Sequence, residues 1–206
     1  MIDDQFAWRL AAELVRIEST DPGTYEDAIE KHIKHLVEQH IETLPDWLSE
    51  AIRITEVEAL PHRRALMVRV AGTSAEPALV YSCHMDTVTL GEGWDDATPA
   101  LGGVVAGERL YGRGACDMKG GLACAIAAFF SLLDEAAAQG SLPRRAFALL
   151  LSVDEEDFMR GVEAAISAGL VGADEWVVDT EPTDGQVQVA HKGRTWFEVT
   201  MTGQTA

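Results

Sequence analysis

Acidic and imidazole side chains recur directly after three strongly apolar segments of the chain. His84 and Asp86 follow residues 79–83, Asp154-Glu155-Glu156 follows residues 147–153, and Asp179 and Glu181 follow residues 176–178. Carboxylates and imidazole are ligand types that bind divalent cations, and an imidazole favours zinc, cobalt or manganese over calcium or magnesium. The pattern therefore predicts metal chemistry, provided that the fold brings these side chains together.

The apolar segments themselves indicate how they are brought together. Nearly continuous apolar runs are typical of strands buried on both faces, and helical segments over residues 118–138 and 162–168 separate them. Strand and helix in alternation predict an α/β sandwich with a mostly parallel central sheet. In such sheets the functional crevice lies outside the carboxyl ends of the strands. So many carboxylates in one place would repel one another, and a pair of divalent cations relieves that repulsion.

Local spacing suggests roles for individual residues. In an extended segment residues two apart point to the same side, so Asp86 can orient the ring of His84. Asp117 lies in the glycine-rich residues 111–121 just before the long helix, where the alternative role is a helix N-cap. Glu155 and Glu156 are adjacent, so only a turn can bring both to one site; one could then bind metal while the other moves protons.

Composition excludes several other classes of function. Of the 206 residues 47% are hydrophobic, and 16 Lys+Arg against 34 Asp+Glu give a formal net charge of -18, which disfavours nucleic acid and anionic membranes as partners. The chain start lacks the pattern of a signal peptide, and no apolar run is expected to span a membrane, so we predict a soluble cytoplasmic protein. Three cysteines without a CxxC pair are no disulfide framework. Neither GxGxxG nor a Gly-Lys pair is present, so a phosphate loop is not expected.

The remaining segments complete the predicted organisation. Residues 6–17 and 25–41 have helical spacing of apolar residues, and residues 52–57 and 65–70 alternate as strands with one polar face. From residue 186 onward the alternation of polar and apolar residues predicts an antiparallel hairpin with one solvent-exposed face. We therefore expect a metal-binding catalytic domain over residues 1–184 and the start of a lid domain over residues 185–206.

Four motifs in order resemble one family. They are Ser82-Cys83-His84-Met85-Asp86-Thr87-Val88, the glycine-rich segment from Gly112 to Gly121, Asp154-Glu155-Glu156, and Glu181-Pro182-Thr183. Together they resemble the acetylornithine deacetylase / succinyl-diaminopimelate desuccinylase / aminoacylase family of co-catalytic zinc metallopeptidases. The resemblance implies a three-layer sandwich of phosphorylase/hydrolase-like zinc-peptidase architecture, followed by the first hairpin of an α+β lid domain.

The resemblance also implies a metal site. His84 and Glu181 would bind one zinc ion, Asp117 would bridge two, and Glu156 would bind the second. Asp179 also lies where ligands of the family occur, and the Glu-Pro-Thr match favours Glu181 over it. Cobalt or manganese could replace zinc. The peptide bond after Asp117 is expected to be cis.

The implied catalytic residues are Glu155, as general base and then acid, and Asp86, which would orient His84. The substrate would be an N-acyl amino acid or small peptide, cleaved at its amide bond by a water activated by two metals.

The resemblance covers only the N-terminal part of the family's chain. Members continue through a lid and dimerisation domain and return with a further histidine ligand, so a homodimer is expected of the full-length form. We expect the 206 residues alone to bind metal weakly and hydrolyse little. The alternative is a non-catalytic truncated or split-gene module, which needs a separate C-terminal half or serves only in binding or assembly.

Overall fold

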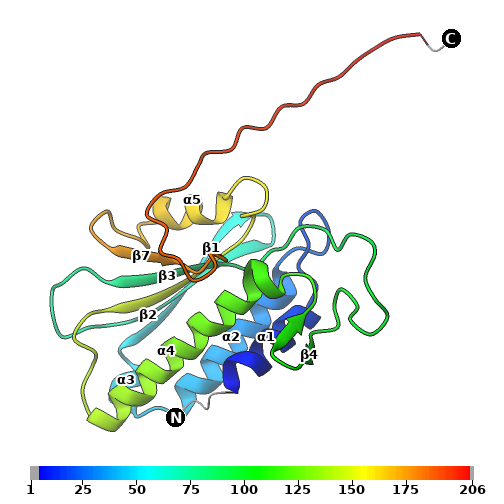
Figure 1. The fold of residues 1–206 in the computed structure, drawn as a ribbon. Helices are drawn as coiled ribbons and strands as arrows, with labels where there is room; N and C mark the ends of the chain where they lie inside the picture. The colour runs from blue at the N-terminus through cyan, green and yellow to red at the C-terminus, as the bar shows by residue number, and fades with distance from the viewer. Residues whose placement is uncertain (1–4, 205–206) are drawn as a thin grey trace.

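A five-stranded sheet with helices on both faces forms the body of the protein (Figure 1). The structure is a computed structural model and describes residues 5–204. The strands of the sheet, in spatial order, are β1 (Ile52–Leu60), β2 (Arg63–Val70), β6 (Phe147–Ser152), β3 (Leu79–His84) and β7 (Trp176–Asp179). A separate two-stranded ribbon joins β4 (Val104–Ala106) to β5 (Arg109–Tyr111).

The sheet is mixed, which corrects the expectation of a mostly parallel one. β6, β3 and β7 run parallel, whereas β1 pairs antiparallel with β2 and β2 pairs antiparallel with β6. For β1 and β2 the reason is their short connection, where His62 has a left-handed φ of 65° and the chain reverses tightly. A connection this short can join only antiparallel neighbours.

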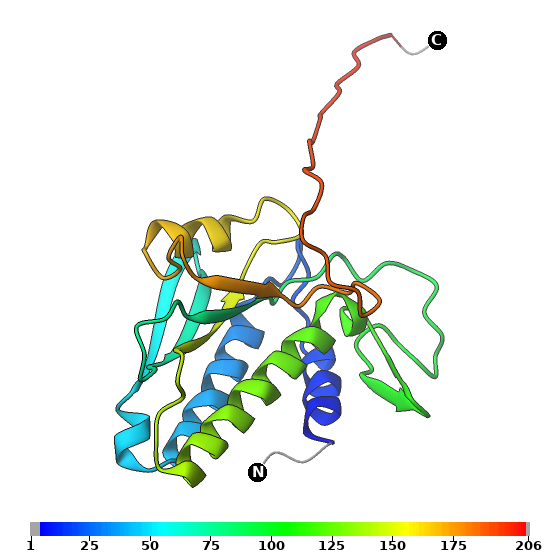
Figure 2. The same ribbon diagram turned by 60° about the vertical axis from the view of Figure 1, so that its left-hand side comes forward.

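Three helices cover one face of the sheet and a fourth covers the other (Figures 1 and 2). The main core packs α1 (Phe6–Arg16), α2 (Asp27–Glu42) and α4 (Gly120–Gln139) against one face. α5 (Arg160–Ser167) lies on the opposite face, over β1 and β2. The short helix α3 (Asp46–Ser49) follows α2 and was not expected from the sequence.

α4 is the central helix of the core. It buries Leu122, Ile126, Phe130 and Leu133 in the core, as its sequence spacing predicts. The preceding segment η1 (Ala115–Lys119) is not a regular helix, because Asp117 and Met118 have non-helical backbone angles; α4 therefore begins two residues later than expected. Residues 115–139 are long and apolar enough to cross a membrane, contrary to the expectation that no segment would be, although length and composition alone are weak evidence. Eight α4 residues are buried in the core, so we assign it as a core helix.

β7 differs from its prediction. Its apolar residues led us to expect a strand buried on both faces, but Trp176, Val177 and Val178 are 64%, 53% and 43% exposed. β7 is an edge strand that pairs only with β3 among the described elements. An apolar strand is buried only where other elements cover it, and the described residues do not cover this edge.

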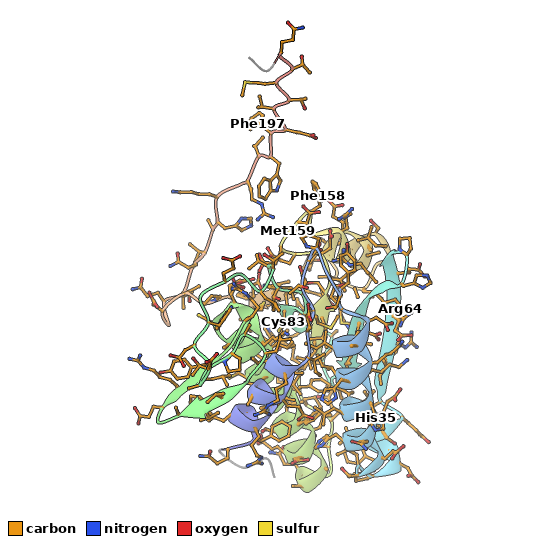
Figure 3. All side chains as sticks on the ribbon, turned by 90° about the vertical axis from the view of Figure 1, so that its right-hand side faces the viewer. His35, Arg64, Cys83, Phe158, Met159 and Phe197 are labelled. Carbon is orange, nitrogen blue, oxygen red and sulfur yellow. The ribbon has the colours of Figure 1, made fainter. Side chains whose placement is uncertain are left out.

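The segment after residue 185 also differs from its prediction. The alternating residues 186–204 form no hairpin; they run away from the body as a single extended chain (Figures 1 and 2). Val189 is 94% exposed, and Phe197 is 83% exposed and lies far out on this segment (Figure 3). A strand needs a hydrogen-bonded neighbour, and no described residue supplies one here. The outer ends of the two predicted domains, residues 1–4 and 205–206, lie outside the described residues.

Candidate metal centre

The carboxyl ends of the parallel strands place the predicted ligands at one edge of the sheet. His84 is the last residue of β3 and lies opposite Ser152, the last residue of β6. On the other side, Ser82 of β3 lies opposite Asp179, the last residue of β7. The segments that follow β6 and β7 carry Glu155, Glu156 and Glu181, so the register of the strands brings them beside His84.

Two glycines bring Asp117 to the same place. A Cβ added at Gly114, which has a left-handed φ of 79°, would lie 2.6 Å from the side chain of Thr87, just beyond β3. A Cβ added at Gly121 would lie 2.3 Å from the carbonyl oxygen of Thr180. The glycine-rich segment thus packs against the ends of both β3 and β7. Asp117 does not cap α4, which has no side-chain N-cap, and the peptide bond after it is cis, as expected.

His84 lies at the centre of the group. Its side chain is 1% exposed, and its Nε2 lies 3.1 Å from Oδ1 of Asp117, 3.3 Å from Oε1 of Glu181 and 3.8 Å from Oε2 of Glu155. Burial alone would lower the pKa of His84, but the surrounding carboxylates of Asp117, Asp86 and Glu181 raise this pKa well above its ordinary value. The site therefore attracts positive charge strongly.

Asp86 contacts the other ring nitrogen of His84. The backbone carbonyl oxygen of Asp86 lies 2.9 Å from Nδ1, and its carboxylate Oδ1 lies 3.6 Å from the same atom. A carbonyl oxygen only accepts, so Nδ1 carries a proton and donates to it. Nε2 is the ring nitrogen that faces the carboxylates, and it is the one that would bind a metal ion. The carboxylate of Asp86 has a second contact, because its Oδ2 accepts the N–H of Glu156 at 2.9 Å.

A turn brings both glutamates to the site, as their adjacency requires. Asp154 follows β6 with a left-handed φ of 66°, and residues 155–158 continue as turn. The result is that Glu155 and Glu156 each place a carboxylate oxygen within 4.8 Å of a His84 ring nitrogen and of each other. Glu156 Oε1 also accepts the N–H of Val88 at 3.3 Å.

Two groups of donor atoms share His84. One comprises His84, Asp117 and Glu181, and the other comprises His84, Glu155 and Glu156; in each, the atoms lie within 4.8 Å of one another. Asp179 joins neither group. One imidazole with several carboxylates fits a pair of divalent cations in its donor chemistry.

The pKa values of the carboxyl groups respond to this crowding. Hydrogen bonding to His84 lowers the pKa of Asp117, whereas burial, together with the charge of Asp117, raises the pKa of Glu156. Burial raises the pKa of Glu155 to about 7, although the nearby imidazole opposes this shift. Opposed shifts among neighbouring groups are typical of functional sites. The thiol of Cys83 is no nucleophile here, because burial raises its pKa to about 12.

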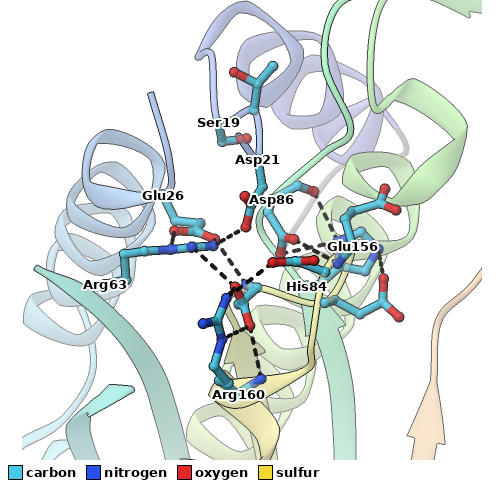
Figure 4. Close-up of polar contacts among 12 residues, drawn as sticks. Ser19, Asp21, Glu26, Arg63, His84, Asp86, Glu156 and Arg160 are labelled. Atoms are coloured by element: carbon cyan, nitrogen blue, oxygen red, sulfur yellow. Dashed lines mark hydrogen bonds and ion pairs between the residues drawn. The ribbon is translucent and has the colours of Figure 1, made fainter. Parts of the chain in front are cut away.

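Sequence reasoning missed several polar residues beside the centre. Asp21, Glu26, Arg63 and Arg160 form a network with Asp154 directly behind it (Figure 4). The only sequence signal was indirect: charged residues stand beside turns and strand ends. Arg194 of the extended segment also reaches the turn and donates to the carbonyls of Glu156 and Asp157 at 3.2 and 2.9 Å.

Comparison with known proteins identifies the family. The sequence model of peptidase family M20/M25/M40 matches residues 80–199, which include the ends of β3, β6 and β7 and all six predicted site residues. The chain belongs to this family. The chain is also 28% identical over 196 residues to a probable succinyl-diaminopimelate desuccinylase of Staphylococcus aureus. This match covers 95% of this chain and 44% of that protein.

Solved structures share the fold of this M20 chain. An M20 family metallo-carboxypeptidase from Sulfolobus solfataricus matches with a TM-score of 0.63 and 18% identity, over 87% of this chain and 37% of that one. The Bacillus subtilis YXEP protein, described as a dinuclear metal binding peptidase, matches with a TM-score of 0.57 and 16% identity, over 86% of this chain and 43% of that one. The chain spans less than half the length of these relatives.

Proposed function

We propose that the complete gene product is a metal-dependent hydrolase that cleaves the amide bond of N-acyl amino acids or small peptides. The observation that carries the proposal is the convergence, around the buried His84, of carboxylates from three separate segments of the chain. Membership of peptidase family M20 supports the reaction type. The desuccinylase name of the Staphylococcus relative supports an N-acyl amino acid as the substrate class.

We propose that His84 and Glu181 hold one zinc ion, Glu156 holds a second, and Asp117 bridges the two. Two divalent ions held by these residues would lower the pKa of a water molecule and polarise the scissile carbonyl. The 3.1 Å and 3.3 Å approaches of Asp117 and Glu181 to His84 Nε2 support the first assignment. Asp179 joins neither donor group, which supports Glu181 as the ligand.

Glu155 is the proposed general base. Its carboxylate takes a proton from the attacking water and then delivers it to the leaving amine nitrogen. A pKa raised to about 7 by burial suits this task, because a group that titrates near the working pH can both accept and donate. Asp86 fixes the tautomer of His84 through its backbone carbonyl and holds the N–H of Glu156 through its carboxylate.

Domain organisation, oligomeric state and location belong to the same proposal. Residues 1–184 would form the metal-binding domain and residues 185–206 the start of a lid, which is supported by the departure of the chain from the body after β7 (Figure 2). The complete protein would be a cytoplasmic homodimer. A non-catalytic binding or assembly module is not favoured, because the side chains suited to metal and proton transfer are all gathered at one site.

Replacement of the proposed base tests the mechanism. In the complete gene product Glu155→Gln should retain its metal ions and lose about 10²- to 10⁴-fold in kcat, the usual contribution of a positioned base. Hydrolysis would be followed on N-succinyl and N-acetyl amino acids and on dipeptides, with metal content measured in parallel. Glu163→Gln, at an exposed position of α5, is the matched control and should change neither quantity. Unchanged turnover in Glu155→Gln would disprove the assigned role.

A further inference from the structure

A buried guanidinium lies directly behind the proposed metal centre. Arg63, the first residue of β2, is 8% exposed and donates from Nε and Nη2 to both carboxylate oxygens of Glu26, at 2.7 and 2.5 Å. Nη2 also donates to Asp21 at 2.5 Å, and Nη1 donates to Asp154 at 3.2 Å. The guanidinium carbon lies 4.4 Å from the centre of the Tyr25 ring. Figure 4 shows Arg63 between Glu26 and the turn that carries Glu156.

Glu26 continues the contact from Arg63 to the backbone of the turn. Its Oε1, which accepts from Arg63, also accepts the N–H of Asp154 at 3.0 Å. Asp154 is the residue with the left-handed backbone that starts the turn. A non-glycine residue adopts this conformation only where its surroundings hold it there.

The side chain of Asp154 is held as firmly as its backbone. It is fully buried, accepts from Arg63, and accepts two hydrogen bonds from the guanidinium of Arg160 at 2.5 and 2.6 Å. The next fixed point is the N–H of Glu156, which Asp86 accepts. Glu155 lies between these two fixed points, so its position depends on both.

The charges around Arg63 explain why an arginine stands here. Asp21, Glu26 and Asp86 each place one carboxylate oxygen within 4.8 Å of the others, and all three are buried or nearly so. Arg63 pairs with the first two of these and with Asp154. A planar guanidinium can contact several carboxylates at fixed angles, whereas the ammonium of a lysine is a single point charge.

We propose that Arg63, held by Glu26, is a positioning residue that sets the Asp154–Glu156 turn and with it the placement of Glu155 and Glu156. The predicted effect of Arg63 on turnover rests on the proposed function, whereas its predicted effect on the order of the turn does not. Glu26 and Arg63 both lie outside residues 80–199, the range that the family model matches. The two therefore join a separate part of the chain to the residues of the metal centre.

Hydrogen exchange tests the structural consequence without metal. In the metal-free complete gene product, Arg63→Lys keeps the positive charge but loses the planar guanidinium and its paired N–H donors. Exchange of the amides of residues 154–159 should rise about tenfold or more, as expected when a charge-assisted hydrogen bond is lost. Glu26→Gln, a milder change, should raise exchange in the same residues.

The matched control is Arg69→Lys. Arg69 lies near the other end of the same strand, opposite Ala148 at the start of β6, and also makes a bidentate pair, with Glu175 at 2.7 and 3.0 Å. This variant should leave exchange in residues 154–159 unchanged. Equal amide exchange of residues 154–159 in Arg63→Lys, Glu26→Gln and Arg69→Lys would overturn the proposal. A rise spread evenly over β1 and β2 in Arg63→Lys would also overturn it, because it would indicate general loosening alone.

Kinetics then test the catalytic consequence. Arg63→Lys should lower kcat about 10- to 100-fold while KM changes little, the scale found for residues that orient groups around a metal. Metal affinity, measured by competition with a chromophoric chelator, should fall because Glu156 moves. If Glu155→Gln proves active, the proposed function fails while the exchange result still decides the role of Arg63. If exchange rises in Arg63→Lys but kcat and metal affinity match those of Arg69→Lys, the positioning role is disproved.

Discussion

Lys119 is a buried lysine whose ionisation should be measurable as a dependence of stability on pH. It lies two residues after Asp117, is 1% exposed, and donates from Nζ to the carbonyl of Ile17 at 2.7 Å. No carboxylate lies within ion-pair distance of it in the described part of the chain. Burial lowers its pKa from 10.5 to about 8, and the charge of Glu18 opposes this only weakly.

The sign of the effect follows from these two pKa values. The folded protein releases the Lys119 proton near pH 8, whereas the unfolded chain keeps it up to about pH 10.5. The unfolded state therefore binds more protons between these values, and the free energy of unfolding rises with pH there. With each pKa unit worth about 1.4 kcal/mol, the gain between pH 7 and pH 10 is about 2.5 kcal/mol.

Lys119→Met should remove this dependence. The thioether keeps much of the side-chain length but cannot ionise, and the Ile17 carbonyl loses its partner at a cost of about 1 to 3 kcal/mol. The free energy of unfolding of the variant minus that of the wild type should therefore fall by about 2.5 kcal/mol as the pH rises from 7 to 10, because only the wild type gains stability over this range.

Urea unfolding of metal-free protein, followed by tryptophan fluorescence at pH 7 and pH 10, measures this difference. The exposed Lys31, replaced by methionine, is the control and should show no such change. An unchanged difference between Lys119→Met and the wild type at the two pH values would refute the reasoning.

Two further predictions concern the metal ligands. Glu181→Gln should lower the number of metal ions bound per chain by one, whereas Asp179→Asn should leave that number unchanged. The reverse result in a metal analysis would show that Asp179, and not Glu181, is the ligand. Asp86→Asn keeps an acceptor for the N–H of Glu156 but removes a negative charge 3.6 Å from Nδ1 of His84. Its metal affinity, measured against a chromophoric chelator, should fall about 10- to 100-fold, and an unaltered affinity would contradict the role of that charge.

The sequence predicted the site well where the signals are local. The segment 147–152 is fully buried and the segment 79–84 is buried or half-buried, and both are largely apolar, so they could be recognised as strands from their composition alone. Because parallel neighbours end at the same edge, the residues after them could be expected to meet. The adjacency of Glu155 and Glu156 likewise required a turn, and Asp154 begins one.

Other features depend on distant neighbours and could not be predicted from local patterns. The apolar residues of β7 resemble those of a buried strand, and only the spatial order of the strands makes it an edge. The alternation in residues 186–204 is that of a hairpin, yet no described partner pairs with it. The contacts of Arg63 join residues 37 and 91 positions apart, and no local pattern indicates a pairing over such distances.

Metal content tests the central claim most directly. The complete gene product, dialysed against zinc and then against metal-free buffer, would be analysed by mass spectrometry beside its His84→Ala variant. The arrangement of His84 with Asp117, Glu155, Glu156 and Glu181 predicts two zinc ions per wild-type chain and a clear loss in the variant. A wild-type protein that retains no more zinc than His84→Ala would contradict the assignment of this site as a metal centre.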